Sequence, residues 1–274
     1  MMESDRPVRK RKGPPKEPQA PSKTSTSLSE EYWRESQLPL AGLMFVSPLL
    51  IFYELGVLIL GPEAIRNGAE VWMRQLLLAL GIGQYFVLPM LTALILLAAH
   101  HFSRGPWYVR SVTLWGMAVE SVLLAAVLRL LLGLQATAFS QVAGPVSPAV
   151  PAGGIPAETA IPGQASELAA KAVAYVGAGV YEELVFRLVL LTAIALGFKA
   201  LAVPSRSADA LAVCLSSLIF AAAHYVGPMG EPFAVFSLLF RVVAGIFFGV
   251  LFLYRGFGIA AGSHAVYDLL VGLL

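Results

Sequence analysis

The stretch LPLAGLMFVSPLLIFYELGVLIL, residues 38–60, decides the fold, because its only charged side chain is Glu54. A helix needs about 20 predominantly apolar residues to cross the hydrocarbon core of a bilayer. The rest of the 274-residue chain is similar: 57% of its residues are hydrophobic and 13% are charged, whereas a soluble domain carries about 25% charged residues. With a mean hydropathy of +0.74, the chain is predicted to be an integral membrane protein whose main partner is the lipid bilayer.

Six further apolar stretches follow, at 83–102, 112–135, 167–196, 209–227, 233–254 and 257–273. Together with the first, they predict an all-α, polytopic transmembrane helix bundle of about seven spans, with eight as the alternative count. The segment 136–166 is rich in proline and glycine, contains no Lys or Arg, and is predicted to be a loop. It separates N-terminal transmembrane helices, 38–135, from a C-terminal core, 167–274.

The first 37 residues carry 14 of the 36 Asp, Glu, Lys and Arg residues of the chain, including the run RKRK at 9–12. This composition offers little apolar surface to bury, so 1–37 is predicted to be a disordered basic tail. Lys and Arg also concentrate in alternate loops, which predicts a cytoplasmic N-terminus in the cytoplasmic membrane. The net charge of +2 comes from the tail and loops and indicates no nucleic-acid groove. Nothing in the sequence specifies an oligomeric state.

Ionisable side chains within the apolar stretches need a partner or a purpose, because a charge at mid-bilayer costs at least about 2.5–3.5 kcal/mol. In the N-terminal half these residues are Glu54, Glu120 and Arg129. Glu120 and Arg129 lie on opposite faces of one helix, since nine residues at about 100° each make two and a half turns. We therefore predict that these groups form structural pairs between helices.

The stretch 167–196 contains two adjacent carboxylates, Glu182 and Glu183, followed by Arg187. Arg187 lies four residues after Glu183, on the same helix face, where it can form a charge-assisted hydrogen bond. Glu182 is left without a cation on its own helix. A carboxylate in such a low-dielectric site has the properties of a general base.

Two histidines lie in separate later spans. His224 follows Phe220 by one turn, and His264 precedes Asp268 by one turn, so that an imidazole and a carboxyl group share a helix face. A lone histidine in an apolar helix is more often structural, but a set of six ionisable groups in three spans favours a functional site.

The span between these histidines carries Gly245 and Gly249, a small-xxx-small pair that predicts close helix packing. Its Arg241 is a further cation that could serve the same cluster or pair with Asp268.

These motifs resemble the CPBP family, the CAAX proteases and bacteriocin-processing enzymes that are also called Abi proteins. The family pattern is Glu-Glu-x-x-x-Arg, then Phe-x-x-x-His, then His-x-x-x-Asn or Asp. The corresponding residues here are Glu182, Glu183 and Arg187; Phe220 and His224; and His264 and Asp268. The resemblance covers about 167–274 and implies an intramembrane glutamic endopeptidase without a cofactor, acting on a peptide or a lipidated, for example prenylated, protein.

The resemblance also implies roles. Glu182 with His224 would activate a water molecule, Glu183 and Arg187 would support the site, and His264 with Asp268 would stabilise the oxyanion. The best-studied members have Asn in place of Asp268, and a carboxyl group donates a hydrogen bond only when it is protonated. An ionised Asp268 would instead orient His264.

Three other functions remain open on the sequence. Glu182, His224, His264 and Asp268 are acceptable ligands for a divalent metal, although no His-Glu-x-x-His motif is present. A transporter or proton relay would also use intramembrane Glu, His and Arg, but no inverted repeat is evident. The third alternative is an inactive scaffold that binds a membrane partner.

Overall fold

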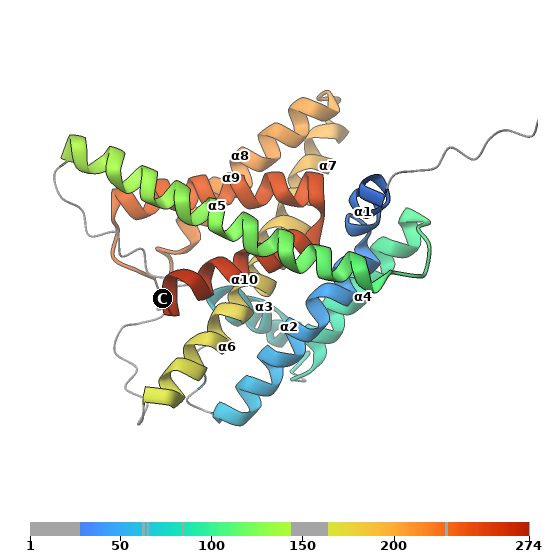
Figure 1. Cartoon of the computed structure of the whole chain (residues 1–274), viewed down its shortest axis with the longest axis horizontal. Helices are drawn as coiled ribbons and strands as arrows, with labels where there is room; N and C mark the ends of the chain where they lie inside the picture. Colours follow the sequence, from blue (N-terminus) through green and yellow to red (C-terminus); the bar gives the residue numbers. More distant parts are fainter. Residues whose placement is uncertain are drawn as a thin grey trace, which may run out of the picture.

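A computed structural model of the chain describes residues 28–61, 64, 66–83, 85–143, 164–227 and 230–273. The regular structure in these residues is helical, and they contain no strand (Figure 1). In chain order the helices are α1 (Leu28–Ser36), α2 (Pro39–Leu60), α3 (Gly68–Ala79), α4 (Val87–Ser103), α5 (Ser111–Ala143), α6 (Gln164–Glu183), the π-helical segment η3 (Leu184–Leu191), α7 (Thr192–Ala200), α8 (Ser205–Ala223), α9 (Val235–Arg255) and α10 (Phe257–Leu273).

The predicted all-α membrane architecture is confirmed, and each of the seven predicted spans coincides with helical structure. Within the described residues, four helices are long and apolar enough to cross a bilayer: α2, α5, α8 and α9. The apolar helices α4 and α10 are shorter, at 17 residues each. The count of about seven spans therefore stays a prediction. Helix α6 continues through η3 into α7 without a break.

Parts of the predicted tail and loop are helical. Residues 28–36 of the predicted tail form α1, and residues 136–143 of the predicted loop extend α5. The remainder of both segments lies outside the described residues. Helix α1 is held on the start of α5, because Glu35 accepts hydrogen bonds from the backbone N–H and Nε of Arg110, at 2.7 and 2.8 Å, and from Thr113. Burial opposes the ionisation of Glu35, but these hydrogen bonds outweigh it and keep the pKa of Glu35 below its ordinary value.

Helix α10 is the centre of the bundle, and it packs against α2, α5, α6 and α9. Most of its residues are buried on every side, as expected for a helix that is apolar all round. Small side chains allow this crowding: a Cβ atom on Gly179 of α6 would lie 2.5 Å from the backbone nitrogen of Ala265. In Figure 1, α5 runs across α9 and α10 on one side of the molecule.

The predicted pairing between helices is confirmed for two carboxylates. Glu120 of α5 binds Arg255 at the end of α9, with an Nε–Oε1 distance of 2.6 Å. Glu54 of α2 accepts a hydrogen bond of 2.5 Å from the hydroxyl of Tyr181 on α6. These pairs join segments far apart in the sequence and satisfy charges that would otherwise be buried alone.

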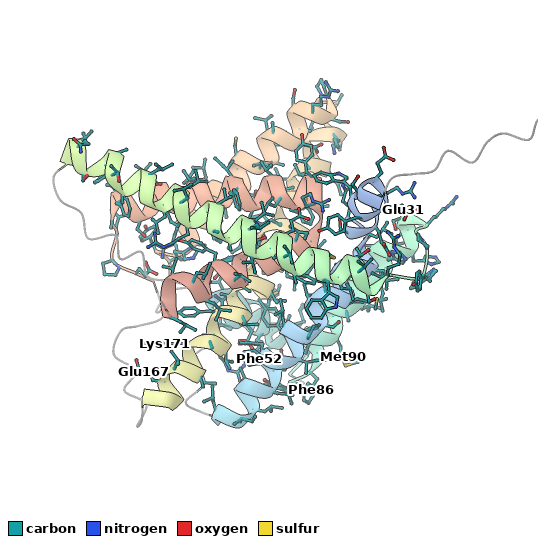
Figure 2. All side chains as sticks on the ribbon, viewed as in Figure 1. Glu31, Phe52, Phe86, Met90, Glu167 and Lys171 are labelled. Atoms are coloured by element: carbon teal, nitrogen blue, oxygen red, sulfur yellow. The ribbon has the colours of Figure 1, made fainter. Side chains whose placement is uncertain are left out.

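The outer faces of the helices are apolar. Among the large hydrophobic side chains exposed there are Phe52 of α2 and Met90 of α4, both labelled in Figure 2. Exposed apolar side chains of this kind are expected to contact lipid tails in an integral membrane protein. The helices thus enclose a polar centre within an apolar surface.

Candidate active site

The two adjacent glutamates lie at the end of α6, just before the helix changes to π-helical geometry at Leu184. Glu182 is 5% exposed and Glu183 is fully buried. A π-helical segment inserts an extra residue into a helix and is frequent at functional sites. Here it begins directly after the carboxylates and carries Arg187.

Glu183 lies at the bottom of the site, where it contacts two nitrogen-bearing side chains. Its Oε1 lies 3.0 Å from Nη1 of Arg187 and 2.7 Å from Nδ1 of His264. The pairing of Glu183 with Arg187 agrees with the sequence prediction. Because Glu183 also binds Nδ1 of His264, it fixes the orientation of that ring and directs Nε2 toward Glu182.

Asp268 faces Nε2 of His264, as its i, i+4 position predicted, whereas the hydrogen bond that orients the ring joins Nδ1 to Glu183. The Oδ2 atom of Asp268 lies 3.6 Å from Nε2 of His264, which is too long for a hydrogen bond. Asp268 is 3% exposed, and its Oδ2 makes no hydrogen bond with the described residues. Its carboxyl group therefore faces the same interior space as Nε2 of His264.

Glu182 faces both histidines with one oxygen atom. Its Oε2 lies 3.9 Å from Nε2 of His224 and 3.8 Å from Nε2 of His264. Its other oxygen, Oε1, accepts a hydrogen bond of 2.5 Å from the side-chain amide of Asn67. Separations slightly above direct hydrogen-bond range suit a bridging water or a substrate atom.

The predicted span 209–227 implied that His224 lies within a helix. In the structure His224 is the residue that ends α8. Its Nδ1 lies 2.9 Å from the carbonyl oxygen of Phe220, and a carbonyl only accepts, so Nδ1 carries the proton in this tautomer. Nε2 of the neutral ring then has a free lone pair directed toward Glu182. The imidazole also contacts the edge of the Phe220 ring, with centroids 4.9 Å apart.

The loop after His224 is fastened by Arg241 and Glu231. The backbone N–H of Glu231 donates to the carbonyl of His224 at 2.9 Å. The Glu231 carboxylate accepts two hydrogen bonds of 2.7 Å from Nη2 of Arg241. Arg241 thus acts on the site indirectly, because it binds Glu231, whose backbone N–H is bonded to His224. The acidic partner shown for Arg241 is Glu231.

Aromatic rings and a backbone carbonyl complete the surroundings of the buried cations. The Arg187 guanidinium lies 4.3 Å from the centroid of the Phe220 ring and donates to the carbonyl of Gly245 at 3.3 Å. The His264 ring stacks on Phe248 at 4.5 Å. The predicted close packing at Gly245 and Gly249 is present, and their neighbours on α8 are Ser217 and Val213.

The structure therefore brings together all six residues singled out from the sequence: Glu182, Glu183, Arg187, His224, His264 and Asp268. No group of three or more His, Cys, Asp or Glu side chains in the described part of the chain is arranged to hold a metal ion. One contact was missed, namely Asn67 at the start of α3. The order Asn67-x-x-Glu70 is the pattern of a helix N-terminus and could have predicted this helix.

The comparisons with known proteins point to the same region. Residues 164–270 match a family model described as type II CAAX prenyl endopeptidase Rce1-like. The matched range contains all six residues named above. Neither the curated proteins nor the solved structures give a significant match.

Proposed function

We propose that this chain is a CAAX-type membrane protease with a glutamic mechanism, because residues 164–270 match the type II CAAX prenyl endopeptidase Rce1-like family. In this mechanism Glu182 and His224 activate a water molecule. The observation that carries the proposal is the position of Oε2 of Glu182 within 4 Å of two imidazole nitrogens. The environment is buried, where a charged group acts strongly on a reacting water.

The first step transfers a proton from water to Oε2 of Glu182 while the water oxygen attacks the peptide carbonyl. His224 accepts a hydrogen bond from the second hydrogen of this water through the lone pair on Nε2, which orients the nucleophile. Collapse of the tetrahedral intermediate breaks the C–N bond, and the proton held by Glu182 passes to the departing amine. The oxygen and the second hydrogen of the water remain in the new carboxyl group, and its first hydrogen is in the new amine.

In this mechanism His264 stabilises the oxyanion. Its Nδ1 is bound to Glu183, so an Nε2–H donor requires the doubly protonated ring, whose charge would be balanced by the surrounding carboxylates. Asp268 assists this electrostatic balance and donates a hydrogen bond itself only when protonated. Arg187 keeps Glu183 in place through the 3.0 Å contact.

We propose that the substrate is a membrane-associated peptide, prenylated or of the bacteriocin type, and that the reaction needs no metal. We further propose that the N-terminus is cytoplasmic, on the basis of the Lys and Arg distribution. Metal-dependent proteolysis is the principal alternative, since the site contains imidazoles and carboxylates.

The test uses purified protein in lipid vesicles with farnesylated and unmodified forms of one C-terminal peptide. We expect mass spectrometry to find one internal cleavage, with the farnesylated form preferred and the rate unchanged by chelators. His224→Ala should lower the rate about 100-fold or more while the variant keeps the wild-type melting temperature. Cleavage by His224→Ala at the wild-type rate would exclude its proposed role, and loss of activity on chelation with recovery on adding zinc would favour the metal-dependent alternative.

A further inference from the structure

The hydrogen bond between Asn67 and Glu182 links the site to a helix outside the matched domain. Asn67 precedes α3, lies 115 positions before Glu182 in sequence, and is 5% exposed. We infer that Asn67 is a positioning residue that fixes which oxygen of Glu182 acts as the base. This inference rests on the proposed function.

The orientation of the Asn67 amide is set by its own helix. Oδ1 of Asn67 accepts a hydrogen bond of 2.8 Å from the backbone N–H of Ala69 and thereby caps the N-terminus of α3. Nδ2 is then the atom that meets Oε1 of Glu182 at 2.5 Å. The reversed amide would lose the cap and place an acceptor against a carboxylate oxygen, so the two partners determine one orientation.

A buried network holds α3 in place, and none of its members takes part in the proposed chemistry. Glu70 is fully buried on α3 and binds Arg66 at 2.7 Å, together with Arg74 and the hydroxyl of Tyr53 on α2. Arg74 also donates to the carbonyl of Tyr85 at 2.8 Å. Tyr53 ties Glu70 to α2, and the carbonyl of Tyr85 ties Arg74 to the segment before α4. These contacts hold α3 against its neighbours, and Asn67 lies at the N-terminus of this helix.

The two carboxylate oxygens of Glu182 therefore have different partners. Oε1 is occupied by Asn67, whereas Oε2 faces His224 and His264. Rotation of the carboxylate would break the bond to Asn67, so the reactive oxygen stays between the imidazoles. The motif residues themselves contain no amide, and α3 supplies this donor from outside the motifs.

The test compares two substitutions that keep the helix cap and remove the amide donor. Asn67→Asp retains an oxygen for the N–H of Ala69 and preserves the size of the side chain, but it sets a carboxylate against Glu182. Asn67→Ser retains a capping oxygen without the charge. Arg66→Gln is the matched control, because it removes one local contact of Glu70, keeps the contacts of Glu70 with Arg74 and Tyr53, and leaves Asn67 intact.

We expect kcat to fall about 10-fold or more in Asn67→Ser and further in Asn67→Asp, with KM nearly unchanged, because the donor acts on the reacting carboxylate and not on substrate binding. The acidic limb of the pH–rate profile of Asn67→Asp should move to higher pH, since a neighbouring negative charge favours protonation of the base. The wild type and Asn67→Asp share the other ionisable groups around Glu182: Glu183, Arg187, His224, His264 and Asp268. Arg66→Gln should keep the wild-type kcat and pH profile.

The inference is overturned if both Asn67 variants keep the wild-type kcat and acidic limb, or if Arg66→Gln reduces kcat as much as they do at an equal loss of melting temperature. Glu182→Gln, assayed in parallel, separates this outcome from failure of the proposed function. If Glu182→Gln is inactive and the Asn67 variants are fully active, only the positioning role of Asn67 is excluded. If Glu182→Gln is active, the general-base role of Glu182 is excluded as well.

Discussion

Glu183 is the residue on which the polar site is built, since it binds the guanidinium of Arg187 and the imidazole of His264 through the same oxygen. Both it and Arg187 are at most 1% exposed. A buried ion pair adds little net stability, because the desolvation penalty offsets the attraction, but removing one partner leaves a charge buried alone. The pair therefore has its main effect on orientation, and it is sensitive to substitution.

Arg187→Ala is expected to destabilise the protein by about 3–5 kcal/mol, because it leaves Glu183 without its guanidinium partner in a buried site. The measurement is thermal unfolding in detergent, followed by tryptophan fluorescence. The double variant Glu183→Gln, Arg187→Met should recover a large part of this loss, because no uncompensated charge remains. A double variant as unstable as Arg187→Ala would show that packing, and not the stranded charge, causes the effect.

At the residue scale, the sequence predicted the six ionisable groups because charged side chains are conspicuous in apolar spans. It also predicted the pairing of Glu183 with Arg187, which follows from helix spacing alone. It predicted that Asp268 faces His264, because the i, i+4 spacing is visible in sequence, but it missed the hydrogen bond of His264 to Glu183, which depends on how α6 and α10 cross. The sequence did not predict Asn67 as part of the site, because an uncharged amide outside the apolar spans does not stand out.

At the scale of the elements, the site depends on the close contact between α6 and α10. Gly179 lies one turn before Glu183, and Ala265 follows His264 directly. A Cβ atom added at Gly179 would come within 2.6 Å of backbone and side-chain atoms of Ala265. The absence of a side chain at this glycine thus allows the 2.7 Å contact between Glu183 and His264.

Gly179→Ala should force α10 away from α6, with a loss of about 1–3 kcal/mol in stability from overpacking and a large fall in kcat. Gly197→Ala on α7 is the control, since a Cβ atom there would meet nothing within 4 Å and alanine favours the helix by about 0.5–1 kcal/mol. Melting temperature and cleavage rate are measured for both. Unchanged stability and activity in Gly179→Ala would contradict the importance of this crossing.

The predicted spans located the apolar helices, because run length and the absence of charge are properties of the sequence alone. Helices α1 and α3 were missed for a common reason. Each is short and amphipathic and is held by tertiary contacts, Glu35 with Arg110 in the first and Glu70 with Tyr53 in the second. The π-helical geometry of η3 has no marker in the residue pattern either.

At the scale of the whole molecule, an apolar exterior surrounds an interior that is largely apolar and that encloses the cluster of ionisable groups. Cys214, the only cysteine of the chain, is exposed on α8, one of the four helices with the length and composition of a span. Its position makes the natural thiol a reporter of the surroundings of that helix.

In intact membranes Cys214 should resist a membrane-impermeant maleimide and react fully after denaturation in SDS, because hydrocarbon excludes the charged reagent. A cysteine placed at Ser22 in a Cys214→Ser background should react only after the membrane is permeabilised, if the N-terminus is cytoplasmic. Rapid labelling of Cys214 without denaturation would place this face of α8 in water, and labelling at position 22 in intact cells would reverse the orientation.

The central claim, that Glu182 is the general base, is tested most directly by the single-turnover cleavage rate of Glu182→Gln in lipid vesicles. Glutamine keeps the size of the side chain and an oxygen that can accept from Asn67, but it cannot take a proton from water. We expect a rate lowered by about 10²–10⁴-fold in a variant that inserts and melts like the wild type. Cleavage of the same peptide at a rate near that of the wild type would contradict it.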